Sequence, residues 1–416
     1  TIVKQILVSS EFKELFYISP IFLSLNRIKP KKLLPSKVIS RKEILKRAKL
    51  NAKPRKLTNS RKNEISHDKL RSEYKEKFPD EEFVDGIKID GYSRRKALMD
   101  SLRTTVRTAD FNNSGNDCPI YPAANYPKTW NLSDVLSNWN VDDTNIPAHI
   151  YQGICVFDAV KDLDKISNYR SAEVPFVIRD HPQVIRTAER WNDKTYMKRL
   201  LQGRSNNVDF SNNNHFLFYD QSKRRPPGWK EPTERVRMRY DEWLDRAAAS
   251  DDPSKPHWYF RLNPGKYLHL ELNFFQRIKS VFIVEPKRQS GIFCRFGMKG
   301  IVAESHFDES RNMLALLGGK RRYILSHPDQ CSKMSLFPND HPSHRHSSLN
   351  WSNPDWDANP DFASTEVNEI VLQIGDVLYL PTHFFHFIVS LTTNYQCNTR
   401  SGKDEKYLNY IQACGD

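Results

Sequence analysis

The chain has 416 residues, of which 38% are hydrophobic and 12% aromatic, and its net charge is +14 at pH 7. This length allows one large domain with extensions, or two domains, and the composition can supply a hydrophobic core. No run of about 18 apolar residues is present, which argues against a transmembrane helix.

Residues 1–105 hold most of the excess positive charge. They are predicted to form a basic N-terminal extension, helical or disordered, because the segments 40–50 and 93–108 place helix-forming residues behind a serine. The Lys- and Arg-rich stretch 27–62 is typical of a solvated tail, although its charge would also let it contact nucleic acid or an anionic surface. Residues 106–145, which include a Gly- and Asn-rich stretch, are predicted to be a linker and lead-in.

From residue 146 to residue 416, short apolar segments alternate with turn signals. Strands are predicted within residues 146–160 and at 172–180, 214–220 and 257–263, and helices at 191–202 and 237–249. More short strands, divided by glycine turns, are predicted in residues 288–308, 311–328 and 369–391. This order indicates a mainly β fold with helices (α+β), an antiparallel sandwich or barrel, of which the double-sheet jelly roll of cupins is one form.

One strand of this region carries a histidine and an aspartate two residues apart, His306 and Asp308. Residues i and i+2 of a strand face the same side, so the imidazole and the carboxylate would point to one place. A single His-x-Asp is a weak signal, and a polar strand face is the ordinary alternative. A later segment, GDVLYLPTHFFHF, supplies His383 and His386 after Pro381. Two histidines and one carboxylate form the metal site of non-haem Fe(II) oxygenases.

The ordered set HFD, Asn312, GGKRRYIL, GDVLYLPTHFFHFIVSL and Asn398 resembles the JmjC and cupin-like Fe(II)/2-oxoglutarate oxygenases. It is similar in particular to the asparaginyl hydroxylase that inhibits hypoxia-inducible factor and to its small JmjC-only relatives. The likeness spans roughly residues 146–402 and is strongest over residues 291–402. It implies a double-stranded β-helix, Fe(II) as the metal, and 2-oxoglutarate and O2 as co-substrates.

The resemblance also implies roles for single residues. His306, Asp308 and His386 match the catalytic metal ligands, with His383 as a competing third ligand. Arg321 stands where the family usually has a lysine that anchors 2-oxoglutarate, and strand alternation directs its neighbours in the chain to the other side. Further matches to co-substrate positions are Asn312, Asn398 and Tyr259.

One departure from the family lies three residues before the first histidine. The family has a hydroxyl side chain at this position, and this chain has Ala303. Ser305 would replace that hydroxyl only if the strand bulges. The aromatic residues around the motifs, Phe307, Phe384, Phe385 and Phe387, are predicted either to exclude water from the site or to be ordinary core residues.

The predicted function is that of an Fe(II)- and 2-oxoglutarate-dependent dioxygenase that hydroxylates a protein side chain and converts 2-oxoglutarate to succinate. A JmjC lysine demethylase and an RNA hydroxylase are alternatives with the same chemistry. An inactive cupin-fold binding module is an alternative of another class. A protein is the expected substrate partner, and a monomer is slightly favoured because few residues follow Gly402.

The six cysteines contain no CxxC pair, so neither a zinc knuckle nor a disulfide framework is predicted. Cys294 and Cys397 are expected to be small core residues. The default location is therefore cytoplasmic or nuclear, unless a targeting segment precedes Thr1. The histidines of HPSHRHSS, His341, His344 and His346, are predicted to lie in a loop and not to form a second metal site.

Overall fold

The structure is a computed structural model that describes residues 83–84, 87–88, 91–109, 118–249, 252–262, 266–275 and 280–415. The predicted helix at 40–50, most of the basic extension and the centre of the predicted linker lie outside these residues. The described residues all belong to one compact unit. Over the part of the chain that is described, no helix is both long and apolar enough to cross a bilayer.

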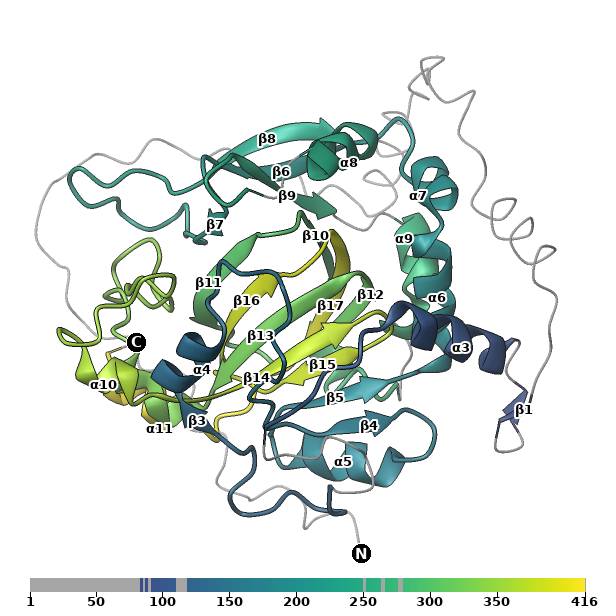
Figure 1. Cartoon of the computed structure of the whole chain (residues 1–416), viewed down its shortest axis with the longest axis horizontal. Coiled ribbons are helices and arrows are strands. Elements are labelled where there is room, and N and C mark those ends of the chain that lie inside the picture. Colours follow the sequence, from purple (N-terminus) through teal and green to yellow (C-terminus); the bar gives the residue numbers. More distant parts are fainter. Residues whose placement is uncertain are drawn as a thin grey trace, which may run out of the picture. The chain divides into compact units, whose positions relative to one another are not determined.

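Two β-sheets form the centre of the molecule (Figure 1). The eight strands that build them are β10 (Gln289–Gly297), β11 (Val302–Phe307), β12 (Asn312–Gly318), β13 (Lys320–Ser326), β14 (Glu366–Gln373), β15 (Val377–Leu380), β16 (Phe385–Ser390) and β17 (Asn394–Ser401). One sheet has the neighbour order β15-β12-β17-β10 and the other the order β14-β13-β16-β11. This is the double-stranded β-helix of a jelly roll, and the predicted α+β fold class is confirmed.

Strand alternation explains how one apolar run fills two separate cores. Tyr323 and Leu325 of β13 lie in the core between the sheets, whereas Ile324 belongs to a second core on the outer face of the six-stranded sheet. The turn before β13 requires a glycine at Gly319, because its φ is +73° and a Cβ atom there would lie 2.3 Å from the Thr393 carbonyl oxygen.

Shorter strands extend both sheets at their edges. The nine-stranded sheet gains β4 (Val156–Asp158), β5 (Phe176–Arg179), β6 (Ser205–Ser211), β8 (Glu234–Arg239) and β9 (His257–Leu262), and the six-stranded sheet gains β3 (Trp130–Asn131) and β7 (His215–Phe216). Two further strands, β1 (Phe83–Val84) and β2 (Ile87–Lys88), pair only with each other. The strands predicted within 146–160, 172–180, 214–220 and 257–263 are confirmed, whereas β6 was missed because its polar sequence SNNVDFS lacks apolar alternation.

Helices cover the outer faces of both sheets (Figure 1). The core outside the nine-stranded sheet includes residues of α3 (Tyr92–Leu102), α5 (Leu163–Ser171), α6 (Pro182–Asn192), α7 (Lys194–Leu200) and α8 (Tyr240–Ala249), and Leu268 of α9 (Lys266–Glu271). The core outside the six-stranded sheet includes residues of α4 (Leu132–Asn138), α10 (Pro360–Ala363) and α11 (Leu408–Ala413). The helix predicted at 191–202 begins at Lys194, because the Asp193 carboxylate accepts hydrogen bonds from the N–H groups of Thr195 and Tyr196.

All six cysteines form disulfides, so the prediction of no disulfide framework is wrong. The pairs are Cys118–Cys155, Cys294–Cys397 and Cys331–Cys414, with Cα–Cα distances of 6.2, 4.0 and 6.0 Å. The partners are 37, 103 and 83 residues apart in the chain, so no local spacing rule reveals them.

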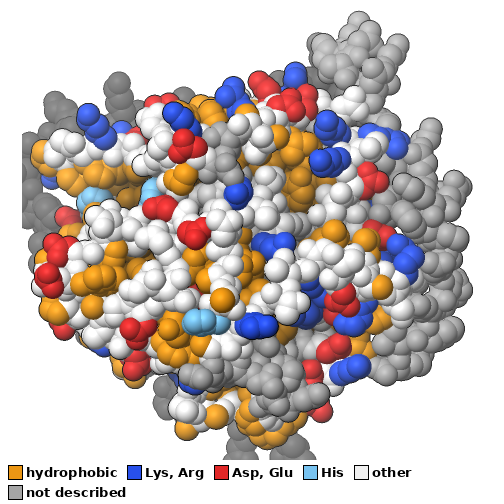
Figure 2. Space-filling view, viewed as in Figure 1, with side chains coloured by type: hydrophobic (Ala, Val, Ile, Leu, Met, Phe, Trp, Pro, Cys, Tyr) orange, Lys and Arg blue, Asp and Glu red, His pale blue; other side chains and the backbone are white. Residues whose placement is uncertain are grey.

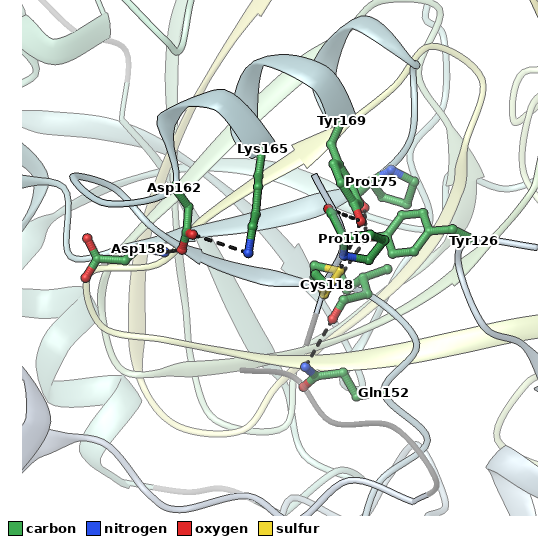
Figure 3. The surroundings of a disulfide bond; sticks show 11 residues. Cys118, Pro119, Tyr126, Gln152, Asp158, Asp162, Lys165, Tyr169 and Pro175 are labelled. Atoms are coloured by element: carbon green, nitrogen blue, oxygen red, sulfur yellow. Dashed lines mark hydrogen bonds and ion pairs between the residues drawn. A yellow bond between two sulfur atoms is a disulfide. The ribbon is translucent and has the colours of Figure 1, made fainter. Parts of the chain in front are cut away.

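The first disulfide joins the lead-in segment to the region of β4 (Figure 3). Beside it, the rings of Tyr126 and Tyr169 meet edge to face with centroids 5.0 Å apart. The Tyr169 hydroxyl donates to the Pro119 carbonyl oxygen at 3.3 Å, and the Cys155 N–H donates to the Tyr126 hydroxyl at 3.0 Å. The lead-in is therefore attached to the domain by a covalent bond, by ring packing and by hydrogen bonds.

Candidate active site

The site begins with two histidines on neighbouring strands. In the antiparallel pair β11–β16, His306 lies opposite His386, and their ring centroids are 4.2 Å apart. The register shifts by one residue between Ala303 and His306, which is a β-bulge in β11. Because of this bulge, Ala303 and His306 line the same cavity although they are three residues apart.

Both imidazoles are oriented by their own strands. Nδ1 of His306 is 2.7 Å from the Glu304 carbonyl oxygen, and Nδ1 of His386 is 3.1 Å from that of Phe384. A carbonyl only accepts hydrogen bonds, so Nδ1 carries the proton and Nε2 keeps its lone pair. Burial lowers the pKa of both rings, and for His306 the neighbouring histidines lower it further. Both rings are therefore neutral near pH 7, which is the form that binds a metal.

Asp308 follows β11 and is held by two side chains. Its Oδ2 accepts a hydrogen bond from Asn312 at 2.8 Å and its Oδ1 accepts one from Arg400 at 2.5 Å. Asn398 in turn donates to Asn312 at 2.9 Å. Burial alone would raise the pKa of the Asp308 carboxyl, but Arg400, the two histidines and Asn312 hold it below its usual value. The carboxylate is thus ionised and fixed in orientation.

A cavity of about 260 Å³ contains these groups. Of the predicted site residues, His306, Asp308, His386, Asn312, Asn398 and Tyr259 line it, and Arg321 does not. Five arginines line it as well, and none of them was predicted: Arg235, Arg261, Arg295, Arg345 and Arg400, which we call the arginine cluster.

The family model of the cupin-like domain matches residues 163–402, more than half of the chain. The chain belongs to the cupin-like (JmjC) oxygenase family.

Three relatives show how far this likeness extends. JmjC domain-containing protein D of Dictyostelium discoideum is 28% identical over 99 residues, which are 24% of this chain and 22% of that protein. tRNA wybutosine-synthesizing protein 5 of Danio rerio is 26% identical over 164 residues, 36% of this chain and 49% of its own length. Lysine-specific demethylase 8 of Danio rerio is 35% identical over 101 residues, 24% of each chain. The chain thus covers at most about half of these relatives.

JmjC family members generally use Fe(II) and 2-oxoglutarate. The residues of the site can therefore be compared with the ligands that these two groups require. Within the described residues, no three His, Cys, Asp or Glu side chains already surround one point. The Asp308 carboxylate bonds to Arg400 and Asn312. The donor set still fits Fe(II), because two neutral imidazoles and one carboxylate line one cavity. A metal would bind Asp308 at a carboxylate that Arg400 and Asn312 also contact.

Arg321 lies behind the cavity and fits an anion anchor. It is fully buried, Nε donates to the Asn394 side chain at 2.5 Å, and Cζ lies 5.5 Å from the centroid of the Tyr259 ring. Its Nη1 is buried and, among the described residues, has no hydrogen-bond acceptor. Tyr259 lines the cavity. A carboxylate bound beside its ring would give Nη1 of Arg321 the hydrogen-bond acceptor that it lacks.

The neighbour of Arg321 points to the other side of the sheet, as strand alternation predicts. The Arg322 guanidinium forms an ion pair with Glu369 at 2.6 Å and lies over the Trp139 ring. Ser305 does not replace the missing hydroxyl: the bulge is present, but Ala303 lines the cavity and Ser305 does not.

The aromatic residues divide between the cavity and the core. Phe307, Phe385 and Phe387 all belong to the core outside the six-stranded sheet, and of these three only Phe307 also lines the cavity. Phe384 packs against His327 and Tyr407. None of Phe384, Phe385 and Phe387 lines the cavity, which favours the core alternative for them.

One of the three loop histidines reaches the site. His346 stacks on His306 with ring centroids 4.8 Å apart and an interplanar angle of 16°, and burial lowers its pKa to about 4. His341 instead stacks on Phe337. The prediction missed His346 because an isolated β-bridge, and not a strand motif, brings it to His306.

His383 forms a backbone hydrogen bond near the site. Its N–H donates to the Asp308 carbonyl oxygen at 2.9 Å, and its φ is +69°. It does not line the cavity. These facts distinguish it from His386, the residue that lies opposite His306.

The contact between His215 of the edge strand β7 and Glu304 of β11 predicts that the stability of the fold depends on pH. Nδ1 of His215 lies 2.6 Å from Glu304. Burial would lower the pKa of His215, but the hydrogen bond and charge of Glu304, together with Asp142, raise it overall. The contribution to stability is therefore fully present below the unfolded pKa of about 6.5 and is lost as the pH rises through the higher folded pKa.

We expect His215→Gln to lower the free energy of unfolding by about 1 kcal/mol more at pH 5.5 than at pH 9, since the pair is only partly exposed. Urea denaturation of both proteins at the two pH values measures this. An equal loss at both would show that the charge of His215 does not contribute.

Proposed function

We propose that this JmjC-family chain is an Fe(II)- and 2-oxoglutarate-dependent dioxygenase that hydroxylates a protein side chain. The observation that carries the proposal is the pairing of His306 and His386 across β11 and β16, with Asp308 beside them in one cavity. The Nε2 atoms of two neutral imidazoles and one ionised carboxylate leave part of an iron coordination sphere for co-substrates. An inactive binding module would not need two imidazoles and a carboxylate in one cavity.

The side chains of the site have separate tasks in this proposal. His306, His386 and Asp308 hold the metal, and the chain from Asn398 through Asn312 orients the Asp308 carboxylate. Arg321 and Tyr259 receive the distal carboxylate of 2-oxoglutarate. Iron with 2-oxoglutarate supplies the oxidative decarboxylation that yields succinate and drives hydroxylation.

The experiment that tests the proposal uses the full chain without oxygen. Adding Fe(II) and then 2-oxoglutarate should produce a weak visible charge-transfer band, and admitting air with a candidate peptide should release succinate. Absence of the band would favour the binding module. A lysine demethylase, as in the name of one relative, would release formaldehyde from methylated peptides, and an RNA hydroxylase would respond to RNA and not to peptide.

Arg321 is expected to set the affinity for 2-oxoglutarate. Replacing it with leucine removes a charge-assisted hydrogen bond, worth about 1.5–3 kcal/mol, so the dissociation constant should rise about 10- to 100-fold. Titrating the charge-transfer band with 2-oxoglutarate measures this, and Arg321→Lys should recover part of the affinity. If the affinity is unchanged in Arg321→Leu, the anchor is another arginine, and Arg295 of the arginine cluster is the next candidate.

A further inference from the structure

The arginine cluster gives the cavity a charge that the metal chemistry does not explain. Five arginines and two aspartates, Asp209 and Asp308, line the cavity, and the lining contains no lysine or glutamate. Fe(II) and the 2-oxoglutarate dianion would add opposite and equal charges, so the loaded cavity would remain positive. Figure 2 shows Lys, Arg, Asp and Glu side chains interspersed on one face of the molecule.

The arginines differ in how far acidic groups neutralise them. Asp209 forms ion pairs with Arg261 and, at 3.8 Å, with Arg235. Within the part of the chain that the structure describes, the acidic partner of Arg345 is Glu309, at 3.6 Å, and the Glu309 side chain is 62% exposed. Among the described residues, no carboxylate lies within ion-pairing distance of Arg295, whose Nη1 donates to the Cys294 carbonyl oxygen. Burial and the neighbouring Arg261 lower the pKa of Arg295 to about 10.

Loading the site would change the surroundings of one more cation. Arg400 is paired with Asp308 in the structure, and a metal would take that carboxylate as a ligand. Arg400, whose side chain is 40% exposed, would then share Asp308 with the metal and be available to an anionic group that enters with the substrate.

We propose that the substrate of this oxygenase presents an aspartate or glutamate side chain to the cavity, held by Arg345, Arg400 and Arg295. This inference rests on the proposed function and adds the class of substrate to it. A methyl-lysine cation is disfavoured, because like charges in a partly buried site repel.

The size of the cavity favours a protein side chain over RNA. Cavities that enclose a drug-sized ligand measure ~300–1,000 Å³, whereas this cavity measures about 260 Å³ and must also admit 2-oxoglutarate. The remaining space suits a single amino-acid side chain. The apolar residues Leu217 and Phe218 beside the cluster suit the methylene groups of such a side chain.

The test compares peptides that are identical except for one central residue, which is Asp, Glu, Asn, Gln or trimethyl-lysine. Binding is measured by fluorescence anisotropy, without oxygen, on the full chain loaded with Fe(II) and 2-oxoglutarate. We expect the acidic peptides to bind at least about tenfold more tightly than their amide counterparts, with an advantage that shrinks as salt rises. Equal binding, or tighter binding of the trimethyl-lysine peptide or of an RNA oligonucleotide, would overturn the proposal.

Two variants localise the effect. Arg345→Gln should remove most of the preference for acidic peptides and leave the charge-transfer band unchanged. Arg237→Gln is the matched control, because Arg237 is an exposed arginine of β8 that does not line the cavity, and it should keep the preference. If the unmodified chain shows no charge-transfer band, the proposed function itself is refuted. A band without a preference for acidic peptides would refute only the substrate class.

The disulfides carry a second and independent inference. Each joins segments distant in the chain: Cys294 and Cys397 lie opposite each other on β10 and β17, and Cys331–Cys414 ties the 3₁₀ helix at residues 328–333 to the segment after α11. No cysteine is left free. We infer that the chain folds in an oxidising compartment, where structural disulfides persist, and not in the reducing one that cysteine spacing suggests.

The oxidant for disulfide formation is the oxidised form of a thiol–disulfide oxidoreductase. Each pair of cysteine thiols loses two protons and two electrons and forms one S–S bond, while the disulfide of the oxidoreductase is reduced to a dithiol. Three such exchanges complete the framework.

Thiol counting tests the second inference. The full chain is isolated from its own cells in acid, denatured, and treated with an alkylating reagent before and after reduction. We expect no alkylated cysteine before reduction and six after it, with three cross-linked peptides in a non-reducing digest. Six alkylated cysteines before reduction would overturn the inference.

Discussion

Replacing His386 with alanine is expected to abolish the charge-transfer band and to lower succinate release at least about a hundredfold. Loss of a group that only orients a metal ligand already costs about 10- to 100-fold in affinity or activity, and His386 is proposed as a ligand itself. Its ring lies 4.2 Å from that of His306, centroid to centroid. Anaerobic titration with Fe(II) and 2-oxoglutarate, followed by a succinate assay in air, measures both effects.

His383 is the matched control for this experiment, because it lies three residues away and does not line the cavity. Asparagine adopts the positive φ of this position readily, so His383→Asn should keep the backbone bond to Asp308 and the band. The reverse result, a band lost with His383→Asn and kept with His386→Ala, would make His383 the third ligand.

Replacing Glu369 with alanine is expected to destabilise the fold by about 3–5 kcal/mol, because it leaves Arg322 buried without its ion-pair partner. Both side chains are fully buried, with Nε and Oε2 2.6 Å apart. Glu369 also accepts a hydrogen bond from the Tyr151 N–H at 2.8 Å. The pair joins β13 and β14 to the core outside the six-stranded sheet, so urea denaturation should show a lower midpoint.

An exposed ion pair provides the comparison. Arg239 and Asp241 are 57% and 55% exposed and lie 3.1 Å apart, so Asp241→Ala should cost less than about 1 kcal/mol. If Glu369→Ala costs no more than Asp241→Ala, the buried pair contributes no more to the stability of the domain than an exposed one.

Patterns within one segment were readable before the structure was known. The apolar runs around Gly318 and Gly319 gave β12 and β13, and the His306–Asp308 spacing gave a pair of polar groups at one place. The likeness to the JmjC family then supplied His386. The two strands are confirmed, because strand alternation and glycine turns act over a few residues, whereas the role of His386 as a ligand stays a prediction.

The predictions that failed concern residues that the fold brings together from afar. His346 lies 40 positions from His306 in the numbering, yet a β-bridge stacks their rings. The sequence likewise gave no sign of the disulfide between Cys294 and Cys397, which depends on the register of β10 against β17.

The sequence by itself indicated a mainly β fold with helices, because hydrophobic periodicity is a local property of the chain. The resemblance to the JmjC family added the double-stranded β-helix and the predicted types of ligand. Only the tertiary structure decided which charges share the cavity. Arg235, Arg295 and Arg345 come from separate segments, and no spacing relates them. Sheet pairing and loop packing bring these side chains together. The positive charge of the cavity, on which the proposed substrate class depends, is therefore a property of the fold.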